Sequence, residues 1–141
     1  HEEAIGYLKQ AIATLFDAAG DVETGYAVSS LAQVYLRTGR PELAAEQAGK
    51  ALELLGDRED VRDEIGNVRL VLGRALMALG RSDEAELAFA AAEEAFSSRE
   101  SASLVAAAWM ARGELASARG DAVAAADLYR RAAEALQDFH F

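Results

Sequence analysis

The residues that could carry acid–base or metal chemistry in this chain are carboxylates, arranged in adjacent pairs and in one dense run. The chain has 24 Asp and Glu residues against 14 Lys and Arg residues, a formal net charge of −10. The run from Asp57 to Glu64 has the acid density of a calcium site, but it lacks the glycine and the spaced ligands of an EF-hand loop. It is better explained as a helix N-terminus, where acidic side chains complement the helix dipole. The other acidic pairs, such as Glu93–Glu94, are expected to form a solvated helix face.

Nucleophilic and zinc chemistry need residues that the chain does not offer in a usable pattern. There is no cysteine, which excludes disulfides, thiolate catalysis and Cys-type zinc sites. The two histidines, His1 and His140, lie at opposite ends of the chain, so no triad or zinc cluster can be built around them. The glycines do not form a phosphate-binding loop. The sequence predicts a protein that is not an enzyme, with no metal ligand and no cofactor.

The elements that position the side chains recur at a fixed spacing. The turn glycines Gly39, Gly80 and Gly120 lie 41 and 40 residues apart, and small residues follow each turn at the same offset. Gly80 supplies the left-handed residue that ends a helix, and Gly73 removes a side chain where two helices approach closely. The aligned columns are Ala4, Ala44, Ala85, Ala125; Leu8, Ala48, Phe89, Tyr129; Ala11, Ala51, Ala92, Ala132; and Leu31-Ala32, Leu72-Gly73, Arg112-Gly113.

These columns resemble the tetratricopeptide repeat. That family's motif places a large residue, Leu-Gly and Tyr in the first helix, and Gly, Ala, an aromatic residue and Ala in the turn and second helix. The clearest copy holds Leu72, Gly73, Gly80, Ala85 and Phe89. The resemblance implies an all-α, right-handed superhelix of stacked helical hairpins, with about 3.5 repeats and seven helices. It implies core positions for the aromatic residues Tyr35, Phe89, Trp109 and Tyr129.

The expected organisation is one helical-repeat domain over residues 1–141. A lone second helix is expected over 2–19, followed by hairpins over 21–55, 60–96 and 101–138. Ser82 and Asp121 are candidate N-caps. The N-terminal helix over 2–19 has a wide apolar surface that includes Ile5, Leu8, Ile12, Leu15 and Phe16, whereas the C-terminal helix has a polar outer side. We therefore expect the C-terminal part of a longer protein.

The first helices of such hairpins line the concave surface of the array. The side chains expected there mix amide, hydroxyl, thioether and charged groups: Tyr26, Ser29, Gln33, Arg37, Asn67, Leu70, Arg74, Met77, Met110 and Glu114. Amides could bond to a peptide backbone, while Arg37 and Arg74 could bind a carboxylate. Arrays of this family that clamp a C-terminal carboxylate use Lys and Asn at these registers, so that particular activity is not expected. A solvated groove without a dedicated ligand remains the alternative.

The chain from Leu72 to Phe96 and from Ala106 to Phe141 is similar to the C-terminal region of actinobacterial Xre-type transcription regulators. That resemblance implies a sensor or dimerisation region whose helix-turn-helix domain precedes His1. A free-standing scaffold or adaptor protein is the alternative function. The predicted partner is a protein or peptide in the groove, with a homodimer as a further option.

Charge and hydropathy argue against two further classes of partner, nucleic acids and membranes. A net charge of −10 would repel a phosphate backbone, so no direct contact with nucleic acid is expected from this segment. The longest uncharged run, Thr24–Leu36, has 13 residues and is too short to span a bilayer. The sequence predicts no membrane partner and a cytoplasmic location.

Overall fold

The structure is a computed structural model that describes residues 1–18, 20–97 and 102–137; the side chains of residues 15–18 and 97 are not part of the description. The described residues form α-helices and one short 3-10 helix, η1. The helices are α1 Glu2–Ala18, α2 Asp21–Arg37, α3 Pro41–Leu55, η1 Glu59–Val61, α4 Arg62–Ala78, α5 Ser82–Ser97, α6 Ala102–Ala118 and α7 Ala122–Gln137. The expected bounds at Ala19, Ser101 and Asp138, and the apolar side chains of Leu15 and Phe16, lie outside the described residues.

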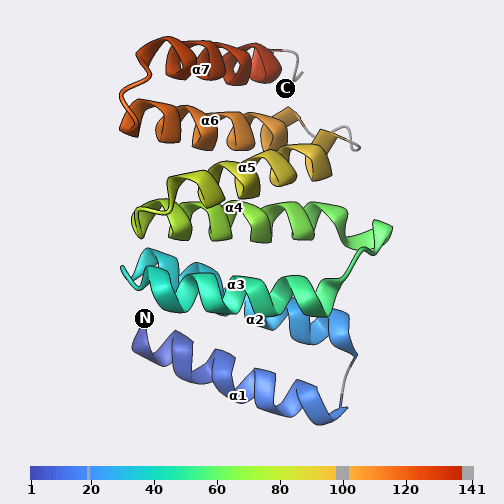
Figure 1. The fold of residues 1–141 in the computed structure, drawn as a ribbon. Helices are drawn as coiled ribbons and strands as arrows, with labels where there is room; N and C mark the ends of the chain where they lie inside the picture. Colours follow the sequence, from blue (N-terminus) through green and yellow to red (C-terminus); the bar gives the residue numbers. More distant parts are fainter. Residues whose placement is uncertain (19, 98–101, 138–141) are drawn as a thin grey trace.

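The helices follow one another in a single stack, with α1 and α7 at its two ends (Figure 1). The most extensive contacts join α2 with α3, α4 with α5 and α6 with α7, which are the three helical hairpins. The first helices also touch across repeats, α2 with α4 and α4 with α6, whereas no comparable contact joins α3 with α5 among the described residues. The predicted all-α solenoid of stacked hairpins is confirmed.

Each hairpin turn is closed in the same way. Gly39, Gly80 and Gly120 have φ of 74°, 77° and 81°, the left-handed conformation that glycine adopts without steric cost. The residue after each glycine donates its backbone N–H to a carbonyl in the last turn of the preceding helix. These three bonds are Arg40 to Tyr35 at 2.8 Å, Arg81 to Leu76 at 2.9 Å and Asp121 to Ala116 at 2.9 Å.

The two candidate N-caps have different outcomes. The Asp121 carboxylate accepts a hydrogen bond from the backbone N–H of Ala124 at 3.1 Å, as an N-cap of α7 does. Ser82 is instead the first helical residue of α5, one position inside the helix, so the prediction for Ser82 is wrong. In α3 that first position is taken by Pro41, whose fixed φ suits the start of a helix.

The small residues of the repeat lie where two helices of one hairpin meet. The second-helix alanines Ala44, Ala48, Ala51, Ala85, Ala92, Ala125 and Ala132 are all at most 5% exposed. A Cβ added at Gly73 would collide with the Phe89 ring, and one at Gly113 would lie 2.7 Å from Cε1 of Tyr129. The glycines therefore make room for the aromatic residue that faces them in the same hairpin.

The aromatic core was only partly predicted. Phe89 is fully buried and Tyr35 is 4% exposed, as expected. Tyr129 is 39% exposed, although its ring lies against Gly113. Trp109 is half-buried, and its indole Nε1 donates to the Glu93 carboxylate at 2.6 Å. These two rings are less buried than the repeat motif implied.

Candidate protein-interaction surface

The surface formed by α2, α4 and α6 is continuous, and we refer to it as the first-helix face. Two hydrogen bonds cross between neighbouring helices on it. The Ser29 hydroxyl of α2 donates to Oε1 of Glu64 on α4 at 2.8 Å. The Arg74 guanidinium of α4 donates to Oε2 of Glu114 on α6 at 2.8 Å. Registers that are about 40 residues apart in the sequence are therefore side by side in space.

The predicted groove residues on this face differ in how far solvent reaches them. Tyr26 and Met110 are 42% and 44% exposed and offer apolar contact area. Gln33, Asn67, Leu70, Met77 and Glu114 are half-buried, and Arg37 is exposed at the last turn of α2. Leu70 and Met77 also pack against the core that Phe89 centres. This mixture leaves amides, thioethers and one aromatic ring within reach of a partner.

Three of the predicted residues, Ser29, Arg74 and Glu114, are already engaged within the chain. Ser29 is 1% exposed and bonded to Glu64, so its side chain does not line an open groove, and that prediction is corrected. The reason is that Ser29 lies at the α2–α4 contact, where a small hydroxyl lets the two helices approach. Arg74 is paired with Glu114, their side chains being 40% and 39% exposed. An acidic ligand would have to compete with Glu114 for this arginine.

The opposite surface carries α1, α3, α5 and α7, and we refer to it as the second-helix face. Its acids were expected to be solvated; Asp83, Glu84 and Glu94 of α5 are exposed, but for Glu86 and Glu93 the expectation is wrong. Arg112 of α6 contacts Glu86 at 3.0 Å and Glu93 at 2.6 Å, and all three side chains are 25–35% exposed. Partial burial alone would lower the pKa of Arg112, but the bonds to Glu93 and Glu86 outweigh it and hold the pKa above its usual value.

The aligned columns place Arg112 where the two earlier repeats have Leu31 and Leu72, but they did not identify the partners of Arg112. The signal was present: Glu86 and Glu93 are seven residues apart, two helical turns, and therefore lie on one side of α5. A cation on the facing helix can reach both acids.

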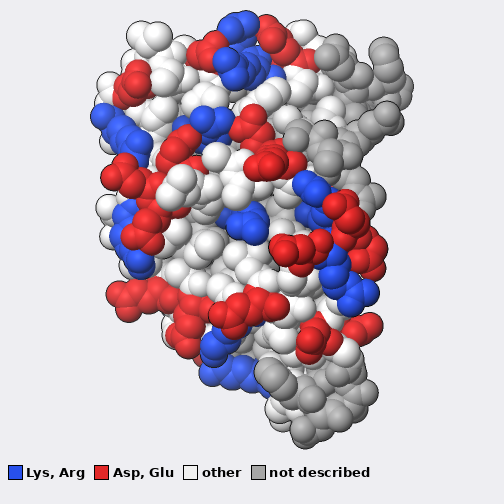
Figure 2. Space-filling model, turned by 45° about the vertical axis from the view of Figure 1, so that its right-hand side comes forward, with Lys and Arg blue, Asp and Glu red and all other residues white. Residues whose placement is uncertain are grey.

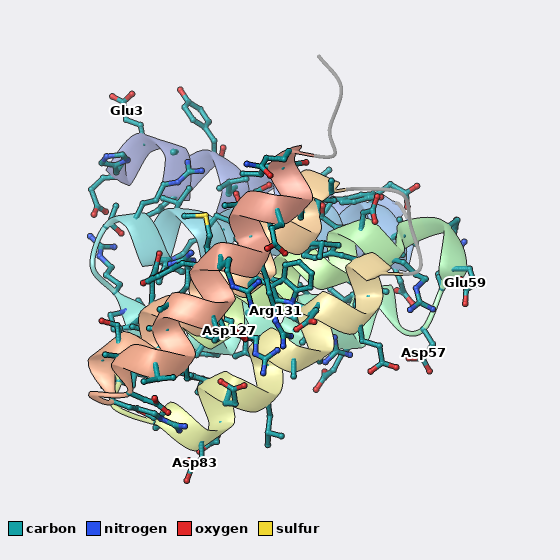
Figure 3. The ribbon with its side chains drawn as sticks, turned by 90° about the horizontal axis from the view of Figure 1, so that it is seen from above. Glu3, Asp57, Glu59, Asp83, Asp127 and Arg131 are labelled. Atoms are coloured by element: carbon teal, nitrogen blue, oxygen red, sulfur yellow. The ribbon has the colours of Figure 1, made fainter. Side chains whose placement is uncertain are left out.

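Other charged groups on the outer parts of the stack pair locally. In the view along the stack, Asp127 and Arg131 lie together on α7, whereas Asp83, Asp57 and Glu59 project at the periphery (Figure 3). Arg131 and Arg130 both bind Asp127, at 3.1 Å and 2.6 Å, and all three are exposed or half-exposed. Figure 2 shows such charges of both signs interspersed over one side of the molecule, with acidic groups in excess over the chain. Exposed pairs of this kind contribute about 0–1 kcal/mol each.

The second-helix face is hollowed between α3 and α5. This hollow, the α3–α5 cleft, has a volume of about 410 Å³. Its lining consists of apolar side chains from α4 and mainly acidic ones from its neighbours: Glu42, Ala45, Glu46, Leu72, Leu76, Leu79, Arg81 and Glu84. A second hollow of about 400 Å³ lies by the α3–α4 linker and is lined in part by Arg62 and Arg69.

Comparison with known proteins agrees with this architecture. Residues 70–138 match the family model of the tetratricopeptide repeat, which supports a tetratricopeptide repeat array. The match does not support the expected resemblance to Xre-type regulators. No curated protein matches the chain.

Two crystal structures have the same fold at low sequence identity. BtubC (BKLC) from P. vanneervenii superposes with a TM-score of 0.87 at 21% identity, over 99% of this chain and 57% of that protein. Aspartyl phosphate phosphatase F from Bacillus subtilis superposes with a TM-score of 0.86 at 14% identity, over 95% of this chain and 35% of that protein. The chain thus spans about half and about one third of these two proteins, and the likeness establishes the fold alone.

None of the described helices combines the length and the apolar character that crossing a membrane requires.

Proposed function

We propose that this chain is a protein-interaction module that binds an extended peptide segment along the first-helix face. The observation that carries the proposal is the continuity of that face, which the Arg74–Glu114 bond links across α4 and α6 at 2.8 Å. Stacked helical hairpins use such extended surfaces to bind partners.

The chemistry of the face favours a peptide over a small molecule. Gln33 of α2 and Asn67 of α4 present amides that can both donate and accept, as a peptide backbone requires. Tyr26 of α2 and Met110 of α6 supply exposed apolar area on the same group of helices, and methionine adapts its shape to different side chains. Three helices contribute to the surface, which suits a ligand that is long rather than compact.

The biological setting is a separate part of the proposal. The resemblance to actinobacterial Xre-type regulators favours a cytoplasmic C-terminal sensor or dimerisation region of a transcription regulator. A free-standing scaffold or adaptor protein fits the same surface. The two settings differ in what the module is attached to, and both use it to bind a protein.

The test is selection from a displayed library of random peptides, followed by titration calorimetry of the selected sequences. Asn67→Ala should weaken binding about fivefold to tenfold, the loss of one to two hydrogen bonds worth roughly 1 kcal/mol in total. Gln47→Ala is the matched control, because Gln47 is a half-buried amide on α3, outside the first-helix face. Equal losses in the two variants, or sensitivity of Gln47 alone, would contradict the proposal.

Self-association through α1 is a second candidate that one observation favours. Ala4 and Ala11 are exposed, while their equivalents Ala44 and Ala51 are fully buried by a first helix. Tyr7, 72% exposed, adds a large apolar group to this side of α1. Ile5 points the other way and is 5% exposed, so it is Tyr7→Lys rather than an Ile5 variant that should lower any association in analytical ultracentrifugation.

A further inference from the structure

The α3–α5 cleft differs chemically from the corresponding place one repeat further along. Its floor is formed by Leu72 and Leu76 of α4 and by Leu79 at the C-cap of that helix, and its rim carries three carboxylates and one guanidinium. Leu72 and Leu79 are half-buried, and Leu76 is 6% exposed. The rim cation, Arg81, is bound through two bonds to Glu84, at 2.9 Å and 2.7 Å. The lining therefore keeps an excess of negative charge above an apolar floor.

In the next repeat, cations of the chain itself occupy the equivalent floor positions. The residues aligned with Leu72 and Leu79 are Arg112 of α6 and Arg119, the first residue after α6. Arg112 binds two acids of α5, and Arg119 binds Asp83 of α5 at 2.8 Å. Each acid at this place has an arginine from the same chain.

In the α3–α5 cleft, an acid is present at the position aligned with Asp83, but no arginine is present at the position aligned with Arg119. Glu42 of α3 aligns with Asp83, and it lines the cleft together with Leu79, the equivalent of Arg119. No ion-pair partner of Glu42 is present among the described residues. Glu46, the next rim acid along α3, has only a 3.4 Å contact with Lys50 in which both side chains are 56% exposed. The cleft thus offers two rim carboxylates to an outside cation, beside an apolar floor.

We propose that the α3–α5 cleft docks a basic amphipathic helix of a partner protein. Apolar side chains of that helix cover Leu72, Leu76 and Leu79, and an arginine or lysine beside them pairs with Glu42, as Arg119 pairs with Asp83. The floor leucines run from Leu72 to the C-cap residue Leu79 of α4, a rise of about 10 Å, which three apolar side chains at i, i+4 and i+7 of a docked helix would match. Charge complementarity selects this partner over a second copy of the chain or an anionic membrane surface, because the chain has a net charge of −10.

The first experiment measures binding of labelled synthetic peptides to the whole chain by fluorescence anisotropy. The peptides are about 15 residues long, near the length at which isolated helices become stable. One has leucine at i, i+4 and i+7 with flanking arginines, a second has the arginines replaced by glutamate, and a third has the leucines replaced by alanine. The Leu/Arg peptide should bind, more weakly at high salt because exposed charges are screened. Absence of binding at about 1 mM, or equal binding of the glutamate peptide, would overturn the proposal.

The second experiment places the peptide in the cleft. Glu42→Gln should weaken binding about fivefold, which corresponds to roughly 1 kcal/mol, whereas Glu53→Gln, an exposed acid of the same helix outside the cleft, should have no effect. Ala45→Phe should fill the cleft and abolish binding, and Ala90→Phe, at an exposed alanine of α5, should not. Thermal melts of all four variants check that the fold is retained.

Three results separate this site from the other surfaces. Asn67→Ala, on the first-helix face, should leave binding of the Leu/Arg peptide unchanged; a loss equal to that of Glu42→Gln would assign the peptide to the first-helix face instead. If Ala45→Phe changes the sedimentation coefficient of the chain alone, a second copy occupies the cleft and the proposal is wrong. If Ala45→Phe binds the peptide as tightly as the unmodified chain, the cleft is not the site.

Discussion

The hairpins α4–α5 and α6–α7 have the same backbone plan but are held together differently. In the first, the aromatic residue facing the glycine is Phe89, which is fully buried, and in the second it is Tyr129, which is 39% exposed. A helix follows α5 and covers it, whereas α7 is the last described helix. Equivalent sequence positions therefore contribute differently to the free energy of unfolding, depending on what packs on the outer side of each hairpin.

The contact that each hairpin makes with the preceding second helix differs as well. Where α4 meets α3, Leu72 lines the same cleft as Ala45 and packs against the same core cluster as Leu52. Where α6 meets α5, the aligned residues are Arg112, Glu86 and Glu93. The residues at the α3–α4 contact are apolar, whereas those at the α5–α6 contact form an ion-pair network. From one repeat to the next, apolar residues on both helices are thus replaced by residues of opposite charge. The same fold therefore forms with an apolar or a charged contact between adjacent hairpins, provided that the residues on the two helices are complementary.

The largest expected effect comes from the two aromatic residues. Phe89→Ala should lower the free energy of unfolding by about 3–5 kcal/mol, because it leaves a cavity beside Gly73. Tyr129→Ala should cost about 1–2 kcal/mol, since part of that ring is already in water. Urea denaturation followed by circular dichroism measures both. Equal losses would mean that the end of the stack is as well covered as its middle.

Disrupting the ion-pair network of Arg112, Glu86 and Glu93 should cause the next largest loss of stability. Arg112→Leu leaves Glu86 and Glu93 side by side without their cation and should cost about 1–3 kcal/mol. The triple variant Arg112→Leu, Glu86→Ala and Glu93→Leu reproduces the chemistry of the α3–α4 contact.

We expect the triple variant to regain most of that loss, because well-packed apolar residues often replace a partly buried ion pair at little cost. The measurement is again denaturant unfolding, with the single variants as controls. A triple variant less stable than Arg112→Leu would show that the two contacts are not equivalent. The loss of the hydrogen bond from the Trp109 indole to Glu93 would then account for the difference.

The repeat spacing was enough to predict most of the fold. Left-handed glycines at 39, 80 and 120 and alanines at matched offsets fix where helices end and which faces meet, because both depend on local backbone and steric rules. The burial of Ser29 was missed because the distance between α2 and α4 depends on tertiary packing. The α3–α5 cleft was missed for a similar reason, since it exists only where two second helices stay apart.

Freeing the first-helix arginine should have a moderate effect on binding and a small one on stability. Glu114→Gln removes the charge that holds Arg74, so a carboxylate-bearing peptide selected on this face should bind about threefold to fivefold more tightly. Stability should change by less than about 0.5 kcal/mol, because both side chains are well exposed. Calorimetry with the acidic peptide and its amide-substituted counterpart measures the difference. An unchanged affinity would place Arg74 outside the binding site.

The smallest effect concerns the aligned acids Asp83 and Glu42. Each is the second residue of its helix, α5 or α3, so each gains the same stabilisation of about 0.3–1 kcal/mol from the helix dipole. Only Asp83 also binds an arginine, Arg119, and that pair is exposed, its carboxylate side being 102% exposed. Asp83→Asn should therefore cost measurably more than Glu42→Gln, because only Asp83 loses a surface ion pair. The excess should disappear at about 1 M salt, where the Debye length is near 3 Å, while most of the fold's stability remains. If Glu42→Gln costs as much as Asp83→Asn at low salt, Glu42 has a cationic partner within this chain and the α3–α5 cleft has no free carboxylate to offer.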